Sequence, residues 1–165
     1  MQFRNNKREG EGTLTDRFGN KYVGEFLEGL RYGKGIFQGK NGLMYDGEWK
    51  SDKYHNFGIL KVPGEFEYEG EFKNGVFHGK GKLITNSKEE YVGEFEDGKK
   101  SGLGRYLDPE GNIYDGIFKD GVFSGSGKLQ LADGRVYQGN FSQGRLEGEG
   151  ILYYLNGDVY EGGFK

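Results

Sequence analysis

Aromatic, small and charged side chains follow a fixed order that returns every 23 residues along the chain. Each copy opens with Tyr, a variable residue, Gly, a variable residue and an aromatic residue, and the variable positions are mostly polar. Alternation with a period of two is typical of a β-strand that buries one face. Without insertion or deletion, the seven copies begin at Tyr22, Tyr45, Tyr68, Tyr91, Tyr114, Tyr137 and Tyr160.

With this Tyr as position 1, Gly recurs at positions 3, 8, 12 and 14, an aromatic residue at position 5 and a large apolar residue at position 16. A helix is disfavoured, because each Gly costs about 1 kcal/mol relative to Ala in a helix interior. A fixed period of about 20 to 50 residues is typical of repeat proteins. We predict an all-β fold, a single-layer antiparallel meander of about seven β-hairpin repeats of 23 residues in an elongated, twisted solenoid.

Turn residues predict two different loops in each repeat. Asn74-Gly75 and Asp120-Gly121, at positions 7 and 8, are dipeptides that supply positive φ in tight hairpin turns. Because 23 is odd, two loops of equal parity would send successive tyrosines to opposite faces. We predict a two-residue turn at positions 7 and 8 and a three-residue loop ending in a left-handed Gly at position 21. Asp52 and Asn56 replace Gly at positions 8 and 12, and we expect positive φ at both.

Length and composition bound the class of protein. The 165 residues predict a single domain, one array over residues 1–165 with a half repeat at about residues 10–21 and a terminal half repeat at residues 160–165. Full repeats begin at positions 22, 45, 68, 91, 114 and 137. The absence of Cys excludes disulfides and thiolate metal sites. A net charge of −3 gives no long-range attraction to nucleic acid, which we do not expect as a partner.

The aromatic row has two interpretations. Its rings either pack on one another between adjacent repeats, or remain partly open because a one-layer sheet cannot bury both sides of every ring. Large contiguous apolar surfaces mark interaction sites. Val76-Phe77 and Val122-Phe123, at positions 9 and 10, are either a rim for a partner or caps on their hairpins. We predict a partner-binding groove formed by Trp49, Tyr68, Phe72, Tyr91, Phe95, Tyr114 and Phe118.

Strand edges are a second candidate interface. An unpaired edge is a template for pairing with another chain unless it is protected. We predict that the strand with Tyr160 and Phe164 pairs with a second copy, forming a homodimer, or with a neighbouring protein.

No residue pattern predicts catalysis, a cofactor or a metal site. His55 and His78 both stand at position 11, and without Cys we interpret them as solvated loop histidines. The Glu row at position 4 recurs too regularly for a catalytic pair, which needs one desolvated pocket, so we interpret it as a solvated face. We predict that the protein is not an enzyme. The Glu row comprises Glu25, Glu48, Glu71 and Glu94.

The stretch from Tyr68 to Leu83, YEGEFKNGVFHGKGKL, resembles the membrane occupation and recognition nexus (MORN) repeat, and the resemblance covers about residues 10–165. It implies a rod-like or gently curved solenoid of hairpins. Proteins similar to this are scaffolds in cilia and flagella, including radial spoke heads, in apicomplexan cytoskeletons and at membrane contacts, or are attached to lipid kinases and methyltransferases. Some hold an extended peptide or a helix along the aromatic groove. Departures at Asp52, Asn56, Gly64-Glu65 and Lys88 concern loop geometry rather than family.

The resemblance favours a non-catalytic scaffold that binds partner proteins within a larger axonemal or cytoskeletal assembly. It implies a cytoplasmic location, in the cytoskeleton or the axoneme of a cilium or flagellum. One alternative is a peripheral membrane or phosphoinositide-binding tether, for which Lys99, Lys100 and Arg105 form a modest basic cluster. The acidic total and the lack of an amphipathic helix disfavour that membrane role. Another alternative is an accessory domain of a larger enzyme.

Overall fold

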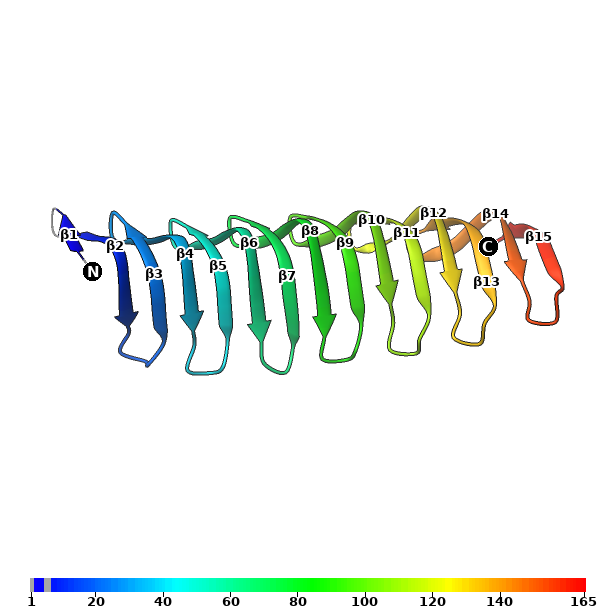
Figure 1. The fold of residues 1–165 in the computed structure, drawn as a ribbon. Helices are drawn as coiled ribbons and strands as arrows, with labels where there is room; N and C mark the ends of the chain where they lie inside the picture. Colours follow the sequence, from blue (N-terminus) through cyan, green and yellow to red (C-terminus); the bar gives the residue numbers. More distant parts are fainter. Residues whose placement is uncertain (1, 5–6) are drawn as a thin grey trace. The chain divides into compact units, whose positions relative to one another are not determined.

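The computed structural model describes residues 2–4 and 7–165, and every regular element in these residues is a β-strand (Figure 1). The chain divides into two compact units, Met1–Gly81 and Lys82–Lys165. The boundary falls inside strand β8 (Val76–Thr85). The 23-residue sequence period continues through this boundary without a change in spacing.

In the first unit, each strand is antiparallel to its neighbours in sequence. A three-residue strand precedes six longer ones within the described residues, and β8 follows them. The strands before β8 are β1 (Gln2–Arg4), β2 (Lys7–Thr15), β3 (Lys21–Leu27), β4 (Leu30–Gln38), β5 (Met44–Lys50), β6 (Lys53–Val62) and β7 (Phe66–Lys73).

The second unit repeats this arrangement, again with every pair antiparallel and in sequence order. The all-β antiparallel meander predicted from the sequence is confirmed. After β8, the strands are β9 (Glu90–Glu96), β10 (Lys99–Leu107), β11 (Ile113–Lys119), β12 (Val122–Gln130), β13 (Val136–Ser142), β14 (Arg145–Tyr153) and β15 (Val159–Phe164).

Two-residue turns join the two strands of each repeat, as predicted. In the first full repeat, Leu27 pairs with Leu30, so only Glu28 and Gly29 lie in the turn. Both have positive φ, at 51° and 87°, as a type I′ turn requires. Asp52, which stands where other repeats have Gly, has φ 65°, so the first of the two expected left-handed residues is confirmed.

Three-residue loops join successive repeats, also as predicted. The Gly39 amide donates to the Leu43 carbonyl at 2.7 Å, and Gly42 closes the loop with φ 88°. Lys88 adopts this conformation in place of Gly, with φ 70°. After Pro63 the positive φ moves one residue earlier, to Gly64 at 77°, because Pro followed by Gly is typical of a type II turn.

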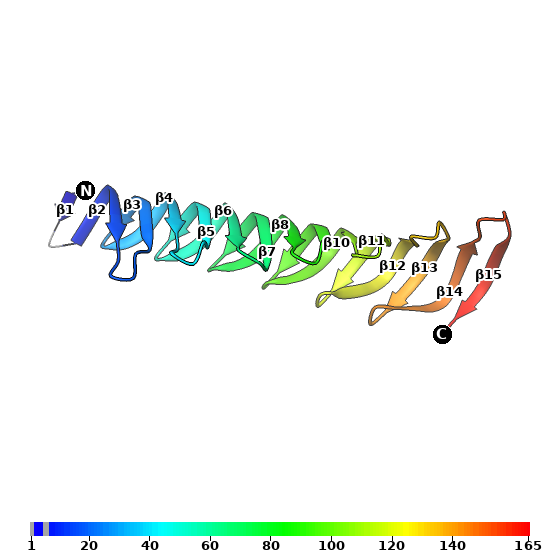
Figure 2. The ribbon, with the colours of Figure 1, turned by 90° about the horizontal axis from the view of Figure 1, so that it is seen from below.

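A bulge interrupts the second strand of each repeat at position 12. Gly24 pairs with Gly35 but Glu25 pairs with Tyr32, so β4 holds two additional residues at this point. Gly33 in this bulge has φ 59°, and Asn56 at the same position has φ 47°, which confirms the second expected left-handed residue. Bulges bend a strand, and the ribbons within each unit bend part-way along their length (Figures 1 and 2).

The tyrosines at position 1 explain the glycines at positions 3 and 14. Tyr22 lies against Gly24 and Gly35, and a Cβ atom added at Gly35 would lie 2.5 Å from two atoms of the ring. Every position-1 hydroxyl donates a hydrogen bond to the carbonyl of position 4, at 2.8–3.2 Å. Within each unit all these tyrosines therefore share one face, which we call the aromatic face.

Candidate partner-binding face

Rings on the aromatic face contact one another edge to face. In the first unit, Tyr22 is 5.1 Å from Phe26 in its own repeat and 5.3 Å from Trp49 in the next. In the second unit, Tyr114 is 5.2 Å from Phe118 and 5.0 Å from Phe141. Centroid distances of about 4.5 to 7 Å with perpendicular planes are the favoured geometry of aromatic pairs. Tyr22 and Tyr114 thus each link two repeats.

The seven residues predicted to line the groove all belong to this row and are buried. None exposes more than 4 % of its surface, so their own rings offer almost nothing to a partner. The expectation that these rings stay partly open is therefore wrong. The rings pack on one another, and side chains from position 10 cover the surface that this packing leaves. Partner binding over the row stays a prediction. The seven residues are Trp49, Tyr68, Phe72, Tyr91, Phe95, Tyr114 and Phe118.

Position 10 supplies the cover in three repeats. Tyr54, Phe77 and Phe123 stack almost parallel on the tyrosine of their own repeat, with centroids 3.8–3.9 Å apart. The sequence allowed two roles for Phe77 and Phe123, as a rim for a partner or as caps on their hairpins. In the structure both rings cover the tyrosine of their own repeat. The covering role of Tyr54 is not among the expectations from sequence. The pairing of positions 5 and 10 across a two-residue turn, which places Tyr54 on this face, is the signal that indicates it.

Cations occupy position 10 in other repeats. The Arg31 Cζ atom lies 4.2 Å from the Trp49 ring centroid but 5.9 Å from that of Tyr22. Its Nε is 2.8 Å from Asp52 Oδ1, and Asp52 Oδ1 also accepts a hydrogen bond from the Arg31 amide at 2.9 Å. Partial burial acts to raise the pKa of Asp52, but the hydrogen bonds and charge of Arg31 outweigh it and leave that pKa lowered.

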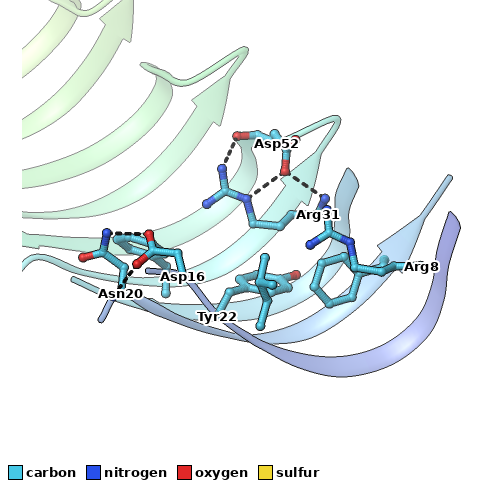
Figure 3. A pocket seen from close by; sticks show the side chains of 9 residues that line it. Arg8, Asp16, Asn20, Tyr22, Arg31 and Asp52 are labelled. Carbon is cyan, nitrogen blue, oxygen red and sulfur yellow. Dashed lines mark hydrogen bonds and ion pairs between the residues drawn. The ribbon is translucent and has the colours of Figure 1, made fainter. Parts of the chain in front are cut away.

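A hollow of about 400 Å³ lies beside Arg31 (Figure 3). Tyr22 and Phe26 are among its aromatic lining, and burial raises the pKa of Tyr22 to about 12. Figure 3 shows Arg8 and Arg31 both extending toward Asp52 at one end of the hollow. Its remaining lining consists of apolar Leu14 and Phe37 and of the hydrogen-bonded pair Asp16 and Asn20.

A smaller hollow, of about 210 Å³, lies in the second unit where position 10 is Lys100. Tyr106, Phe118, Val122 and Phe123 also line it. The two hollows are therefore found on the aromatic face at repeats that have a cation in place of a stacked ring.

Comparison with protein families identifies the repeat. The family model of the MORN repeat matches most of the chain, at residues 2–19, 22–44, 45–61, 68–87, 91–113, 114–134 and 137–159. The chain belongs to the MORN repeat family.

Among solved structures, this MORN protein is similar to the SAS-4 (dCPAP) TCP domain of Drosophila melanogaster, solved in complex with a proline rich motif of Ana2 (dSTIL). The TM-score is 0.51 at 13 % identity, covering 93 % of this chain and 90 % of that chain. This likeness supports the fold alone. Comparison with curated protein sequences gives no match.

Glutamates at position 4 of the MORN repeats accept hydrogen bonds from the backbone, which their interpretation as a solvated face did not include. Glu25 Oε1 accepts a hydrogen bond from the Lys34 amide at 2.9 Å, and Glu71 Oε1 accepts one from the Lys80 amide at 3.0 Å. Both amides belong to position 13, inside the bulge. The carboxylates therefore satisfy backbone donors that the bulge removes from the strand ladder.

The two histidines correct another expectation. His55 lies in β6 and His78 in β8, so they are strand residues rather than loop residues, and both are half-buried. Their Nδ1 atoms are enclosed and have no hydrogen-bond partner. Within residues 7–165, no group of three or more His, Asp or Glu side chains is placed to hold a metal ion.

The basic cluster expected from sequence is divided by the sheet. Lys100 is on the aromatic face, whereas Lys99 pairs with Asp120 at 3.3 Å and Arg105 with Asp115 at 3.1 Å. Lys99 and Arg105 therefore each have a carboxylate partner, whereas Lys100 lies apart from them in the hollow. No helix in the described part of the chain has the length and apolar character needed to span a membrane.

The predicted edge interface involves β15. Phe164 packs edge to face on Tyr137, at 4.7 Å, and so continues the aromatic row. Tyr160 exposes 45 % of its surface and is the most accessible of the position-1 tyrosines. Pairing of this strand with a second copy or another protein stays a prediction.

Proposed function

We propose that the protein is a non-catalytic interaction module that holds an extended segment of a partner protein on its aromatic face. The observation that carries this proposal is the hollow of about 400 Å³ beside Tyr22, Arg31 and Asp52. Binding sites for small ligands commonly occupy about 300 to 1,000 Å³, with mostly apolar lining and a few polar groups that fix orientation. This hollow has that size and that mixture.

An extended segment suits the chemistry of the hollow. Leu14 and Phe37 offer apolar contacts, while Asp16 and Asn20 supply polar groups. Proline-rich segments dock on aromatic surfaces at a low entropic cost, because their backbone is already extended. The complex of the SAS-4 TCP domain with a proline rich motif is a precedent on a similar fold.

We propose further that the protein acts as a scaffold within a cytoskeletal or axonemal assembly in the cytoplasm. The MORN repeats support this, since proteins similar to this one serve as scaffolds there. Fluorescent tagging in the source cell, combined with affinity purification and mass spectrometry, tests the proposal. Enrichment of cytoskeletal or axonemal proteins at a matching location is the expected result, whereas membrane-trafficking proteins as the main partners would contradict it.

The binding proposal is tested with a displayed library of random 12-residue peptides, enriched in Pro, selected on the whole chain. We expect binders that lose at least tenfold in affinity with Phe37→Ala, which removes a wall of the hollow. Leu129→Ala is the matched control, because Leu129 holds the same repeat position in the second unit. Circular dichroism checks the fold of both variants. A library without binders, or binders indifferent to Phe37→Ala, would refute the proposed site.

A further inference from the structure

Of the cations at position 10, Lys100 differs from the arginines in its partners. Arg31 is held by Asp52, and Arg8 donates to the Gly29 carbonyl at 2.8 Å. The Lys100 ammonium has no hydrogen bond or ion pair to any residue in the described part of the chain, and its contacts are with aromatic rings. Its Nζ lies 4.2 Å from the Tyr106 centroid and 5.3 Å from that of Tyr91.

The carboxylate whose charge acts on Lys100 is already engaged. Glu89 accepts a short hydrogen bond from the Tyr106 hydroxyl through Oε1. Its Oε2 accepts from Thr85 at 3.2 Å and from Ser87 at 3.1 Å. Glu89 therefore fixes the Tyr106 ring but leaves the three ammonium donors of Lys100 without an acceptor from the protein.

Partial burial makes the charged ammonium of Lys100 less stable where no acceptor is present. It lowers the pKa of Lys100, and the charge of Glu89 opposes only part of that effect. A partly desolvated ammonium without an acceptor gains strongly from a charge-assisted hydrogen bond. The hollow of about 210 Å³ beside Lys100 provides the space in which an incoming acceptor can reach it.

We propose that this hollow is a subsite for one acidic side chain, Asp or Glu, of a partner protein segment, with Lys100 as the counter-charge. The inference rests on the proposed function, because the acidic residue belongs to a bound polypeptide. Val122 and Phe123 contact the apolar stem of that side chain, and the ammonium binds its carboxylate.

A carboxylate fits better than a phosphate. Phosphate groups carry nearly two charges and are usually held by several donors, often arginines. The hollow supplies one ammonium, and the negative charge of Glu89 acts on that same ammonium. One negative charge on a small side chain matches one ammonium in about 210 Å³.

The test uses the same 12-residue peptide library and a Lys100→Met variant, which keeps the apolar stem and removes the charge. Lys99→Met is the matched control, since Lys99 is adjacent in sequence but pairs with Asp120 outside the hollow. We expect a class of binders that carries an acidic residue and loses at least tenfold in affinity with Lys100→Met but not with Lys99→Met. Exchange of that acidic residue for its amide should cause the same loss, and the two changes together should cost little more than either one.

Several outcomes would overturn the inference. Binders that respond to Phe37→Ala but never to Lys100→Met would leave the proposed function standing and remove the acidic subsite. Binders that depend on Lys100 but carry no acidic residue would refute the carboxylate. Vesicles containing phosphatidylserine that bind the chain only with Lys100 present would assign the hollow to lipid phosphate instead. A library without any binder would remove both proposals. Thermal unfolding of both Met variants verifies that each is folded.

Discussion

Repeats with an aromatic ring at position 10 and repeats with a cation there bury the same tyrosine in different ways. Phe123 stacks on Tyr114 at 3.9 Å and seals it within the sheet. The Lys100 ammonium lies 5.3 Å from the Tyr91 ring centroid, and Arg31 turns away from Tyr22 toward Trp49 and Asp52. The ring-filled repeats use position 10 for packing, whereas the cation-filled repeats leave hollows beside it.

This difference indicates that repeats with the same sequence pattern have different roles. Buried apolar contacts stabilise a repeat, and a partly desolvated cation does not. Sites that break the local rule of a repeat at some cost in stability are the expected places for function. Substitutions that exchange or disturb the two kinds of cover therefore test the comparison directly.

The largest effect is expected for a methyl group placed under the tyrosine. A Cβ atom at Gly127 would lie 2.6 Å from atoms of the Tyr114 ring, and one at Gly104 would lie 2.5 Å from atoms of Tyr91. Tyr114 cannot move outward because Phe123 covers it, so Gly127→Ala should cost about 3 kcal/mol in the free energy of unfolding. Gly104→Ala should cost about 1 to 2 kcal/mol, since the flexible Lys100 can yield.

Urea unfolding monitored by circular dichroism measures both values. Gly121→Ala is the reference for a Gly whose added Cβ atom meets nothing within 4 Å, although its φ of 89° adds strain of its own. Equal costs at Gly127 and Gly104 would show that the residue at position 10 does not decide how firmly the tyrosine is held.

Removal of the cover itself comes next. Phe123→Ala should destabilise the chain by about 2 kcal/mol, below the range of about 3 to 5 kcal/mol for a fully buried Phe, because Phe123 is half-buried. Lys100→Ala should change the free energy of unfolding by less than about 0.5 kcal/mol, since the lost stem contacts are offset by relief of the buried charge. A larger loss for Lys100→Ala than for Phe123→Ala, measured by urea unfolding, would reverse the comparison.

Much of the backbone conformation could be predicted from the sequence because it depends on local rules. The turn at Glu28 and Gly29, the three-residue loop closed by Gly42, and the shared face of all position-1 tyrosines follow from turn chemistry and the odd period. Even Asp52 and Asn56 were assigned the correct sign of φ from residue type alone.

The accessible surface was not predictable in the same way. Two additional residues in the bulge, Gly33 and Lys34, keep all side chains on their faces, so a period-two pattern contains no trace of them. The role of Glu25 as acceptor for the Lys34 amide depends on that bulge. The pairing of Arg31 with Asp52 spans 21 residues and follows no local rule.

A smaller effect, with a gain in stability, is expected for Lys100→Phe, which converts a cation-filled repeat into a ring-filled one. A ring stacked on Tyr91 should stabilise the chain by about 1 kcal/mol at neutral pH. The folded-state pKa of Lys100 is lowered, so below that pKa the native chain bears the cost of a buried charge. As pH rises through that pKa toward the ordinary value of 10.5, the cost disappears and the advantage of the variant should shrink.

Chemical denaturation at several pH values from neutral to about pH 10 gives this difference. The other titratable groups that face Lys100 change charge outside this pH range. Glu89 is ionised throughout it, and burial raises the pKa values of Tyr91 and Tyr106. They are present in both proteins and largely cancel in the difference. An advantage that grows with pH would contradict the assigned direction of the Lys100 pKa.

The smallest effect concerns the cation that does have a partner. Asp52→Asn keeps a residue that tolerates the left-handed conformation but removes the charge opposite Arg31. The Asp52 side chain is 43 % exposed, so the loss at pH 7 should stay below about 1 kcal/mol. Because the folded-state pKa lies below 3.8, this stability is present above the unfolded-state value and is lost as pH falls through the folded pKa. The variant and the native chain should therefore become equally stable in strong acid.

Asp120→Asn is the matched control, since Asp120 also has positive φ and an ion pair, to Lys99, but is 71 % exposed and lies outside both hollows. It should change the free energy of unfolding less than Asp52→Asn does. Equal effects, measured by urea unfolding at pH 7, would mean that Arg31 gains nothing particular from Asp52. Arg31 would then resemble Lys100 as a cation without a firm counter-charge, and the contrast between the two hollows would rest on their size alone.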